Sequence, residues 1–127
     1  YAFAQKIPYA NIMNQRGELV EPTAESISAA ASGVIPADTR TSITNADATG
    51  AYPIATFTWI IIYMEQNYSD RSKEQAIATL DLLQYILSDE AQKITSEVHY
   101  APLPAKAKEL SMKNLKTVTY DGMPILQ

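Results

Sequence analysis

Apolar side chains are patterned most clearly in residues 53–64, where β-branched and aromatic residues dominate, as they do in strands. Pro53 stands at the first position, which a strand tolerates. Apolar and hydroxyl-bearing side chains alternate at first, whereas Ile60, Ile61 and Ile62 are apolar without interruption. This change predicts a strand that begins half exposed and ends covered on both faces, with Ile60 and Ile62 almost fully buried.

Helical spacing governs the chain after residue 70. Ser72 is a suitable N-cap for a long helix that ends near Leu87. Further helices are expected over residues 88–97 and 105–115, followed by a tail from residue 118 that turns at an Asp-Gly pair. One side of the long helix carries an apolar stripe that we expect to pack on a sheet, formed by Ile77, Leu80, Leu83 and Leu87.

The first third of the chain carries weaker patterns. Residues 1–6 predict the end of a helix, and short strands are expected over residues 9–13 and 18–20 around a turn. Thr23 is a candidate N-cap for a short helix, and Gly33 is the candidate residue after its last turn. This helix is only weakly amphipathic, so we expect it to cover a sheet.

An irregular connection is expected over residues 34–51, which hold turn-forming residues without periodicity. Arg40 lies in this connection beside the hydroxyl groups of Thr39, Thr41 and Ser42. Guanidinium and hydroxyl donors together could bind an anion. The same residues in a loop equally suit a solvated surface cluster, which is the favoured interpretation.

Composition narrows the class of protein. The 127 residues are 46% hydrophobic and 19% charged, which describes a folded globular chain. The formal net charge is −4 and basic residues are not clustered, so a nucleic-acid partner is not expected. The absence of cysteine excludes disulfides and thiolate metal sites. The sequence opens in an apparently helical pattern without a Met or a capping residue, so we expect it to be a piece of a longer protein.

Signals for catalysis are weak. The single histidine, His99, stands at an expected helix end, where a capping or partly exposed role is favoured over a metal or base site. Asp81, Asp89 and Glu90 suit a solvated helix face better than a catalytic pair. No phosphate-binding glycine loop or nucleophile motif is present. We therefore expect no enzyme activity, no metal and no cofactor.

Two hydroxyl groups are the remaining candidates for a binding site. Thr56 and Thr58 lie in the expected strand, where they could line a cleft between two lobes. Ordinary strand propensity explains them equally well. The aromatic residues Trp59, Tyr63 and Tyr85 are most simply interpreted as core.

Several groups of residues resemble one known family. They include Tyr-Pro-Ile-Ala-Thr-Phe-Thr at residues 52–58, the long helix after it, and Tyr-Ala-Pro-Leu-Pro at residues 100–104. Residues 1–10, Pro-Thr-Ala-Glu-Ser at 22–26 and Asp-Gly-Met-Pro-Ile-Leu at 121–126 agree as well. In this order they resemble the last third of the phosphate-binding proteins that feed bacterial phosphate ABC transporters.

The resemblance implies an α/β fold, as the C-terminal part of a two-lobe periplasmic-binding-protein fold of type 2. Residues 1–52 would be part of the second lobe, residues 53–64 a crossover strand, and residues 65–127 the C-terminal part of the first lobe. The implied function is the phosphate-binding component of an ABC phosphate importer, located outside the cytoplasm in the periplasm or anchored at the cell surface. Its implied partners are inorganic phosphate, in the intact protein, and a membrane permease.

The family's ligand residues have no counterpart in this chain. The resemblance implies phosphate ligands near a Ser-Gly-Thr motif, but Ser32-Gly33 is followed by Val34. We therefore expect the ligands upstream of Tyr1, and we expect the chain by itself to expose apolar surface and to bind phosphate weakly. Two alternative functions keep the fold, namely a secreted or surface phosphate-binding-like adhesion or regulatory module and a phosphatase.

Overall fold

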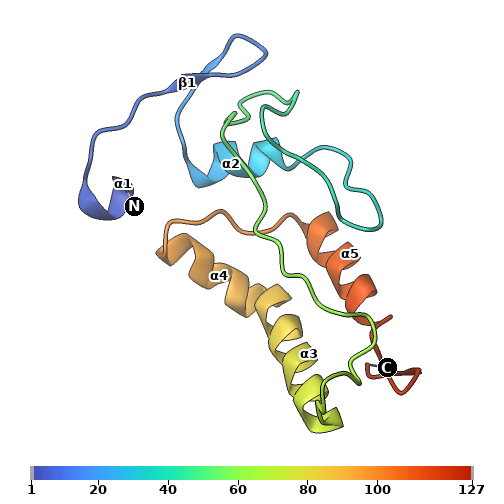
Figure 1. Cartoon of the computed structure of the whole chain (residues 1–127). Coiled ribbons are helices and arrows are strands. Elements are labelled where there is room, and N and C mark those ends of the chain that lie inside the picture. The colour runs from blue at the N-terminus through green and yellow to red at the C-terminus, as the bar shows by residue number, and fades with distance from the viewer. Residues whose placement is uncertain (1, 127) are drawn as a thin grey trace.

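The computed structural model describes residues 2–126, apart from the side chain of Phe3, so parts of the opening motif and the end of the last expected segment lie outside the described residues. Two groups of elements are joined by an extended segment, which is green in Figure 1. The elements are α1 (Ala2–Gln5), β1 (Ile12–Met13), β2 (Leu19–Val20), α2 (Ala24–Ala30), α3 (Lys73–Leu87), α4 (Asp89–Glu97), α5 (Ala105–Leu115), β3 (Thr119–Tyr120) and β4 (Met123–Pro124).

The first group opens with a small antiparallel hairpin and a capped helix. Strands β1 and β2 pair Ile12 with Val20, around a turn in which Gly17 has a φ of 78°. Helix α2 starts with the expected N-cap, because the Thr23 hydroxyl accepts a hydrogen bond from the amide of Ser26 at 3.2 Å. The helix closes at Ala31, earlier than the expected Gly33.

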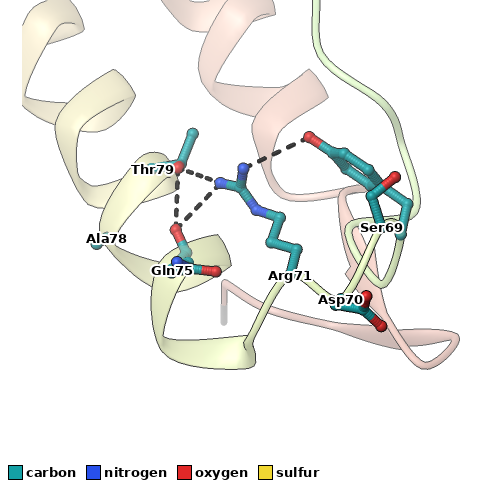
Figure 2. A pocket seen from close by; sticks show the side chains of 7 residues that line it. Ser69, Asp70, Arg71, Gln75, Ala78 and Thr79 are labelled. Atoms are coloured by element: carbon teal, nitrogen blue, oxygen red, sulfur yellow. Dashed lines mark hydrogen bonds between the residues drawn. The ribbon is translucent and has the colours of Figure 1, made fainter.

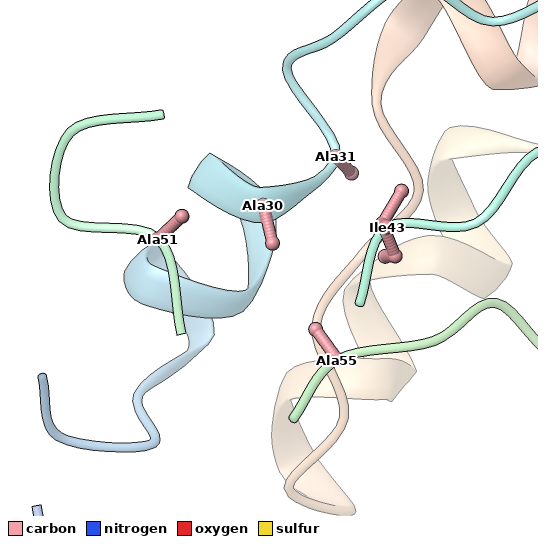
Figure 3. Close-up of a cluster of buried hydrophobic side chains, with 5 residues drawn as sticks. All are labelled: Ala30, Ala31, Ile43, Ala51 and Ala55. Atoms are coloured by element: carbon pink, nitrogen blue, oxygen red, sulfur yellow. The ribbon is translucent and has the colours of Figure 1, made fainter. Parts of the chain in front are cut away.

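The core of the first group is made of small side chains. Figure 3 shows them converging from α2 and from two loop segments that follow it, and they are Ala30, Ala31, Ile43, Ala51 and Ala55. The expected sheet beneath α2 is absent from the described residues. Helix α2 instead packs against the irregular connection, whose Tyr52 amide donates to the Ser26 carbonyl at 2.9 Å.

Residues 53–64 do not form the expected strand. The segment is extended but belongs to no sheet among the described residues, and only its two ends, Pro53 and Met64, accept backbone amide hydrogen bonds. Ile60 is 58% exposed, so its expected burial is wrong, and Ile62 is only half-buried. The reason is physical, because a strand needs an adjacent backbone to satisfy its amides and carbonyls. Trp59, Tyr63 and Tyr85 are also exposed, which contradicts their interpretation as core.

The second group contains the three helices α3, α4 and α5, which begin and end close to where the sequence predicts. Ser72 caps α3, and Ser88 both ends α3 and caps α4. Leu80 and Leu83 are buried against the end of α5 and the segment after it, in a cluster with Leu115 and Val118. The apolar stripe is thus confirmed in its centre, but it faces helix α5 and not a sheet.

The chain ends in the expected Asp-Gly turn. Strands β3 and β4 pair Thr119 with Pro124 and Tyr120 with Met123. Asp121 and Gly122 have φ values of 52° and 72°, as the tight hairpin turn requires. The architecture is therefore mixed helix and strand, and none of the helices among the described residues has the length and apolar character needed to cross a membrane.

Candidate functional site

The two threonine candidates lie on the surface of the extended segment. Thr56 and Thr58 are both exposed, and the Thr56 hydroxyl donates to the carbonyl of Phe57 at 3.2 Å. Neither residue is among those that line the two hollows described below. The structure does not bring these hydroxyl groups together with a charged group.

Arg40 is engaged by a neighbouring carboxylate. Its Nε donates to Asp38 Oδ2 at 2.9 Å and its amide donates to Oδ1 at 3.1 Å. These two hydrogen bonds, the backbone one first, hold the pKa of Asp38 below its usual value. The carboxylate of Asp38 pairs with the guanidinium, and the Arg40 side chain is 84% exposed, which supports the surface-cluster interpretation.

The other titratable candidates do not converge. His99 is exposed at the end of α4, with a φ of 63°. Asp89 accepts a hydrogen bond from the Lys108 side chain on α5, which lowers the pKa of Asp89. Asp81 and Glu90 are exposed on α3 and α4. Among the described residues, no three His, Cys, Asp or Glu side chains are placed to hold a metal ion.

The structure shows an arginine that sequence reasoning missed. Arg71 precedes α3 and folds back over the first turns of that helix, as Figure 2 shows. Its Nη2 donates to the Gln75 carbonyl at 3.1 Å and also to the Thr79 hydroxyl. Its Nη1 donates to the Tyr68 hydroxyl at 3.4 Å, and the guanidinium carbon lies 5.7 Å from the centre of that ring. The guanidinium is thus held in one place.

Arg71 lines two hollows in the surface. The first, of about 560 Å³, lies over the start of α3 and is lined by Tyr68, Ser69, Asp70, Arg71, Gln75, Ala78 and Thr79. The second, of about 390 Å³, is more enclosed, lies toward the extended segment and is lined by Ile61, Ile62, Tyr63, Gln66, Tyr68, Arg71 and Thr79. Tyr68, Arg71 and Thr79 line both.

One donor of this arginine is left over. The Nε of Arg71 is buried and has no hydrogen-bond partner among the described residues. A guanidinium binds phosphate best through two parallel N–H groups. Both terminal nitrogens of Arg71 already donate hydrogen bonds to Tyr68 and Gln75. With both terminal nitrogens engaged and its Nε buried, Arg71 is not arranged to bind an anion through two parallel N–H groups. An isolated arginine before a helix cap carries no sequence signal that would have found this arrangement.

Glu65 organises the other end of the same region. Its carboxylate accepts hydrogen bonds from the Asn67 amide at 2.9 Å, the Thr119 hydroxyl at 2.7 Å, and the amides of Asp121 and Gly122 at 3.0 Å. These donors, the Asn67 amide foremost, lower the pKa of Glu65 to about 2. The carboxylate thereby connects the end of the extended segment to the β3–β4 hairpin.

Comparisons with known proteins find relatives that are much longer than this chain. No protein-family model matches the chain. The phosphate-binding protein PstS of Xylella fastidiosa strain Temecula1 is 36% identical over 107 residues, which cover 82% of this chain and 28% of the relative. The protein of the same name from Methanocaldococcus jannaschii is 30% identical over 127 residues, covering 93% of this chain and 33% of the relative.

The matches extend over most of this chain but not of its relatives. The chain spans about a third of the length of the curated relatives that it matches. A second Xylella fastidiosa strain, 9a5c, carries a protein of the same name that is also 36% identical over 107 residues. The similarity covers 82% to 93% of this chain. The chain is therefore a PstS-like segment, and it corresponds to the C-terminal portion of a phosphate-binding protein.

Proposed function

We propose that this chain is the C-terminal part of the phosphate-binding component of an ABC phosphate importer. The observation that carries the proposal is the similarity of nearly the whole chain to three proteins named phosphate-binding protein PstS. The intact protein would act outside the cytoplasm, in the periplasm or anchored at the cell surface. It would deliver inorganic phosphate to a membrane permease and would act as a binding protein without enzyme activity or a cofactor.

The two groups of elements suggest how the chain is divided in the intact protein. Residues 1–52 would belong to one lobe of a two-lobe fold of type 2, and residues 65–127 would complete the other. Residues 53–64 would cross between them. In support, Ala55 near the start of this segment belongs to one hydrophobic cluster, Ile62 near its end packs against the other, and the two clusters share no residue.

The mechanism we propose is closure of the two lobes around a desolvated phosphate. Burying that charge is costly unless many charge-assisted hydrogen bonds replace water. The arginines of this chain are engaged elsewhere, since Arg16 pairs with Asp47 at 3.1 Å, Arg40 with Asp38, and Arg71 with Thr79. We therefore place the main phosphate ligands in the rest of the intact protein, with Thr56 and Thr58 as the cleft candidates of this chain.

Calorimetric titration with inorganic phosphate tests the proposal. The longer polypeptide that contains this segment is expected to bind phosphate at micromolar concentration or below, with sulfate as the control anion. The 127-residue chain alone is expected to bind far more weakly, because it lacks a matching set of donors. Failure of the longer polypeptide to bind phosphate would refute the proposed phosphate-binding function. Micromolar binding by the monomeric chain would show that the site lies within these residues.

A further inference from the structure

The turn between β3 and β4 contains the only Asp-Gly pair of the sequence, which has no Asn-Gly pair either. An aspartate followed by glycine cyclises more easily than before any other residue, because glycine has no side chain to shield its amide nitrogen. Asp121 and Gly122 are both exposed. Sequence and exposure together therefore predict a chemically labile peptide bond at this turn.

The cyclisation needs no partner other than water. The amide nitrogen of Gly122 loses its proton and attacks Cγ of Asp121, so that a C–N bond forms, the Cγ–O bond breaks and one water molecule leaves. The five-membered succinimide that results takes up water again at either of its two carbonyl carbons. One product is the original aspartate. The other is isoaspartate, in which the main chain runs through the former side-chain carboxyl group.

Both reacting groups are held by residues that lie far away in the sequence. The amide of Gly122 donates to Oε2 of Glu65 at 3.0 Å, and the amide of Asp121 donates to Oε1 of the same carboxylate at 3.0 Å. The Asp121 carboxylate accepts a hydrogen bond from the side-chain amide of Asn67. The attacking nitrogen therefore directs its proton toward Glu65, while Asn67 holds the carboxylate that it would attack.

Glu65 is suited to restrain this amide and not to deprotonate it. The Asn67 amide, foremost among its donors, lowers the pKa of Glu65 to about 2, and so weak a base accepts a hydrogen bond without removing the proton. The hairpin adds a second restraint, because ring closure requires rotation about the Cα–C bond of Asp121. Tyr120 and Met123 pair on either side of the turn, which opposes that rotation.

We propose that Asp121–Gly122 is a site of spontaneous isoaspartate formation, which Glu65 and Asn67 keep closed in the folded protein. Isoaspartate adds one carbon atom to the main chain within a two-residue loop, and a tight hairpin turn does not accommodate it. Glu65 would then lose two amide donors, and with them part of the connection between the extended segment and the hairpin. The inference rests on contacts within this chain and is independent of phosphate binding.

Isoaspartate formation is measured in the longer polypeptide that contains this segment. The protein is incubated at neutral pH, and isoaspartate at residue 121 is quantified by peptide mapping and mass spectrometry. The protein unfolded in guanidinium chloride gives the unrestrained rate, and the folded protein should react about tenfold or more slowly. Glu65→Ala should raise the rate of the folded protein about tenfold, because two hydrogen bonds to a charged group are lost. Asn67→Ala should raise it by a smaller factor.

Glu18→Ala is the matched control, because Glu18 also accepts a glycine amide, that of Gly50 at 2.8 Å. This variant should leave the rate at residue 121 unchanged. Isoaspartate at Asp47, which is followed by alanine, reports general unfolding and should stay equally low in all the folded proteins. If Glu65→Ala raises the rate at Asp47 as well, Asn67→Ala decides the test and must raise the rate at residue 121 alone.

Three results would overturn the inference. The first is a folded protein that reacts as fast as the unfolded one, since the turn would then be unprotected. The second is an unchanged rate at residue 121 in both Glu65→Ala and Asn67→Ala. The third is a slower rate in Glu65→Ala, which would show that the Glu65 carboxylate promotes the attack as a base.

Discussion

The two hydrophobic clusters of this molecule are built from different side chains. The cluster in the first group consists of four alanines and Ile43, and only Ala30 lies within the bounds of a helix. The cluster in the second group consists of Leu80, Leu83, Leu115 and Val118, three of them on helices. Because burial stabilises in proportion to apolar area, each residue of the second cluster contributes more than an alanine does. The first group must therefore depend on other interactions.

Polar contacts supply much of what the first cluster lacks. Asn14 is only 4% exposed, and its side-chain amide donates to Glu18 at 2.8 Å and to the Ala51 carbonyl at 3.2 Å. The Gly50 amide donates to the same Glu18 carboxylate at 2.8 Å. These contacts join the first hairpin to the irregular connection. The comparison shows one region held by side-chain burial and one held largely by hydrogen bonds between loops.

The largest expected effect is on the second cluster. Leu80 is fully buried, so Leu80→Ala should lower the free energy of unfolding by about 2–5 kcal/mol through lost burial and a residual cavity. Urea denaturation measures this loss. Leu82→Ala is the matched control on the same helix, because Leu82 is 57% exposed and its truncation should cost less than about 0.5 kcal/mol. Equal midpoints for the two variants would show that Leu80 is not core.

The N-caps of α2 and α3 allow the two regions to be compared, because the same kind of hydrogen bond can be removed from each. Thr23→Ala and Ser72→Ala each remove a hydroxyl that accepts an amide hydrogen bond, at 3.2 Å in α2 and 3.3 Å in α3. Each change should cost about 1 kcal/mol, measured by hydrogen exchange of the amides of its own helix. Ser72→Asp keeps an acceptor and serves as the control. Loss of α2 protection on changing Ser72 would contradict the division into two regions.

The smallest expected effect is the acid titration of the Glu65 carboxylate, which we compare with the titration of Glu18. The pKa of Glu65 is lowered to about 2 from 4.5, so its contribution is present above pH 4.5 and is lost as the pH falls through about 2. The amide resonance of Gly122, followed by NMR, should therefore titrate near pH 2 and stop titrating in Glu65→Gln.

Glu18 provides the internal control for that titration. Its pKa is lowered by hydrogen bonds from Asn14 and from the Gly50 amide, in the first group. Glu18→Gln should therefore alter the acid titration of the Gly50 amide and leave that of Gly122 unchanged. A midpoint near 4.5 for Gly122 would show that the donors around Glu65 do not stabilise its charge.

Much of the local structure could be predicted from the residues alone. The caps at Thr23, Ser72 and Ser88 and the turn at Asp121 depend on contacts within a few residues. The expected placement of helix stripes against a sheet was wrong, because the described residues contain only two short hairpins. The hydrogen bonds of Arg71 and Glu65 were not predicted from the sequence. Glu65 meets residues more than fifty positions away, and no local pattern announces such a contact.

The sequence by itself determined the helices, their caps, the turns and the relation to phosphate-binding proteins. These follow from short-range hydrogen bonding, from helical periodicity and from residues that can be compared one by one. Only the tertiary structure decided whether residues 53–64 form a strand. Their composition favours a strand, but a strand exists only beside another backbone that satisfies its amides and carbonyls. The described residues supply no such neighbour along most of its length, so the segment stays extended and largely unpaired, with Ile60 and Ile61 exposed.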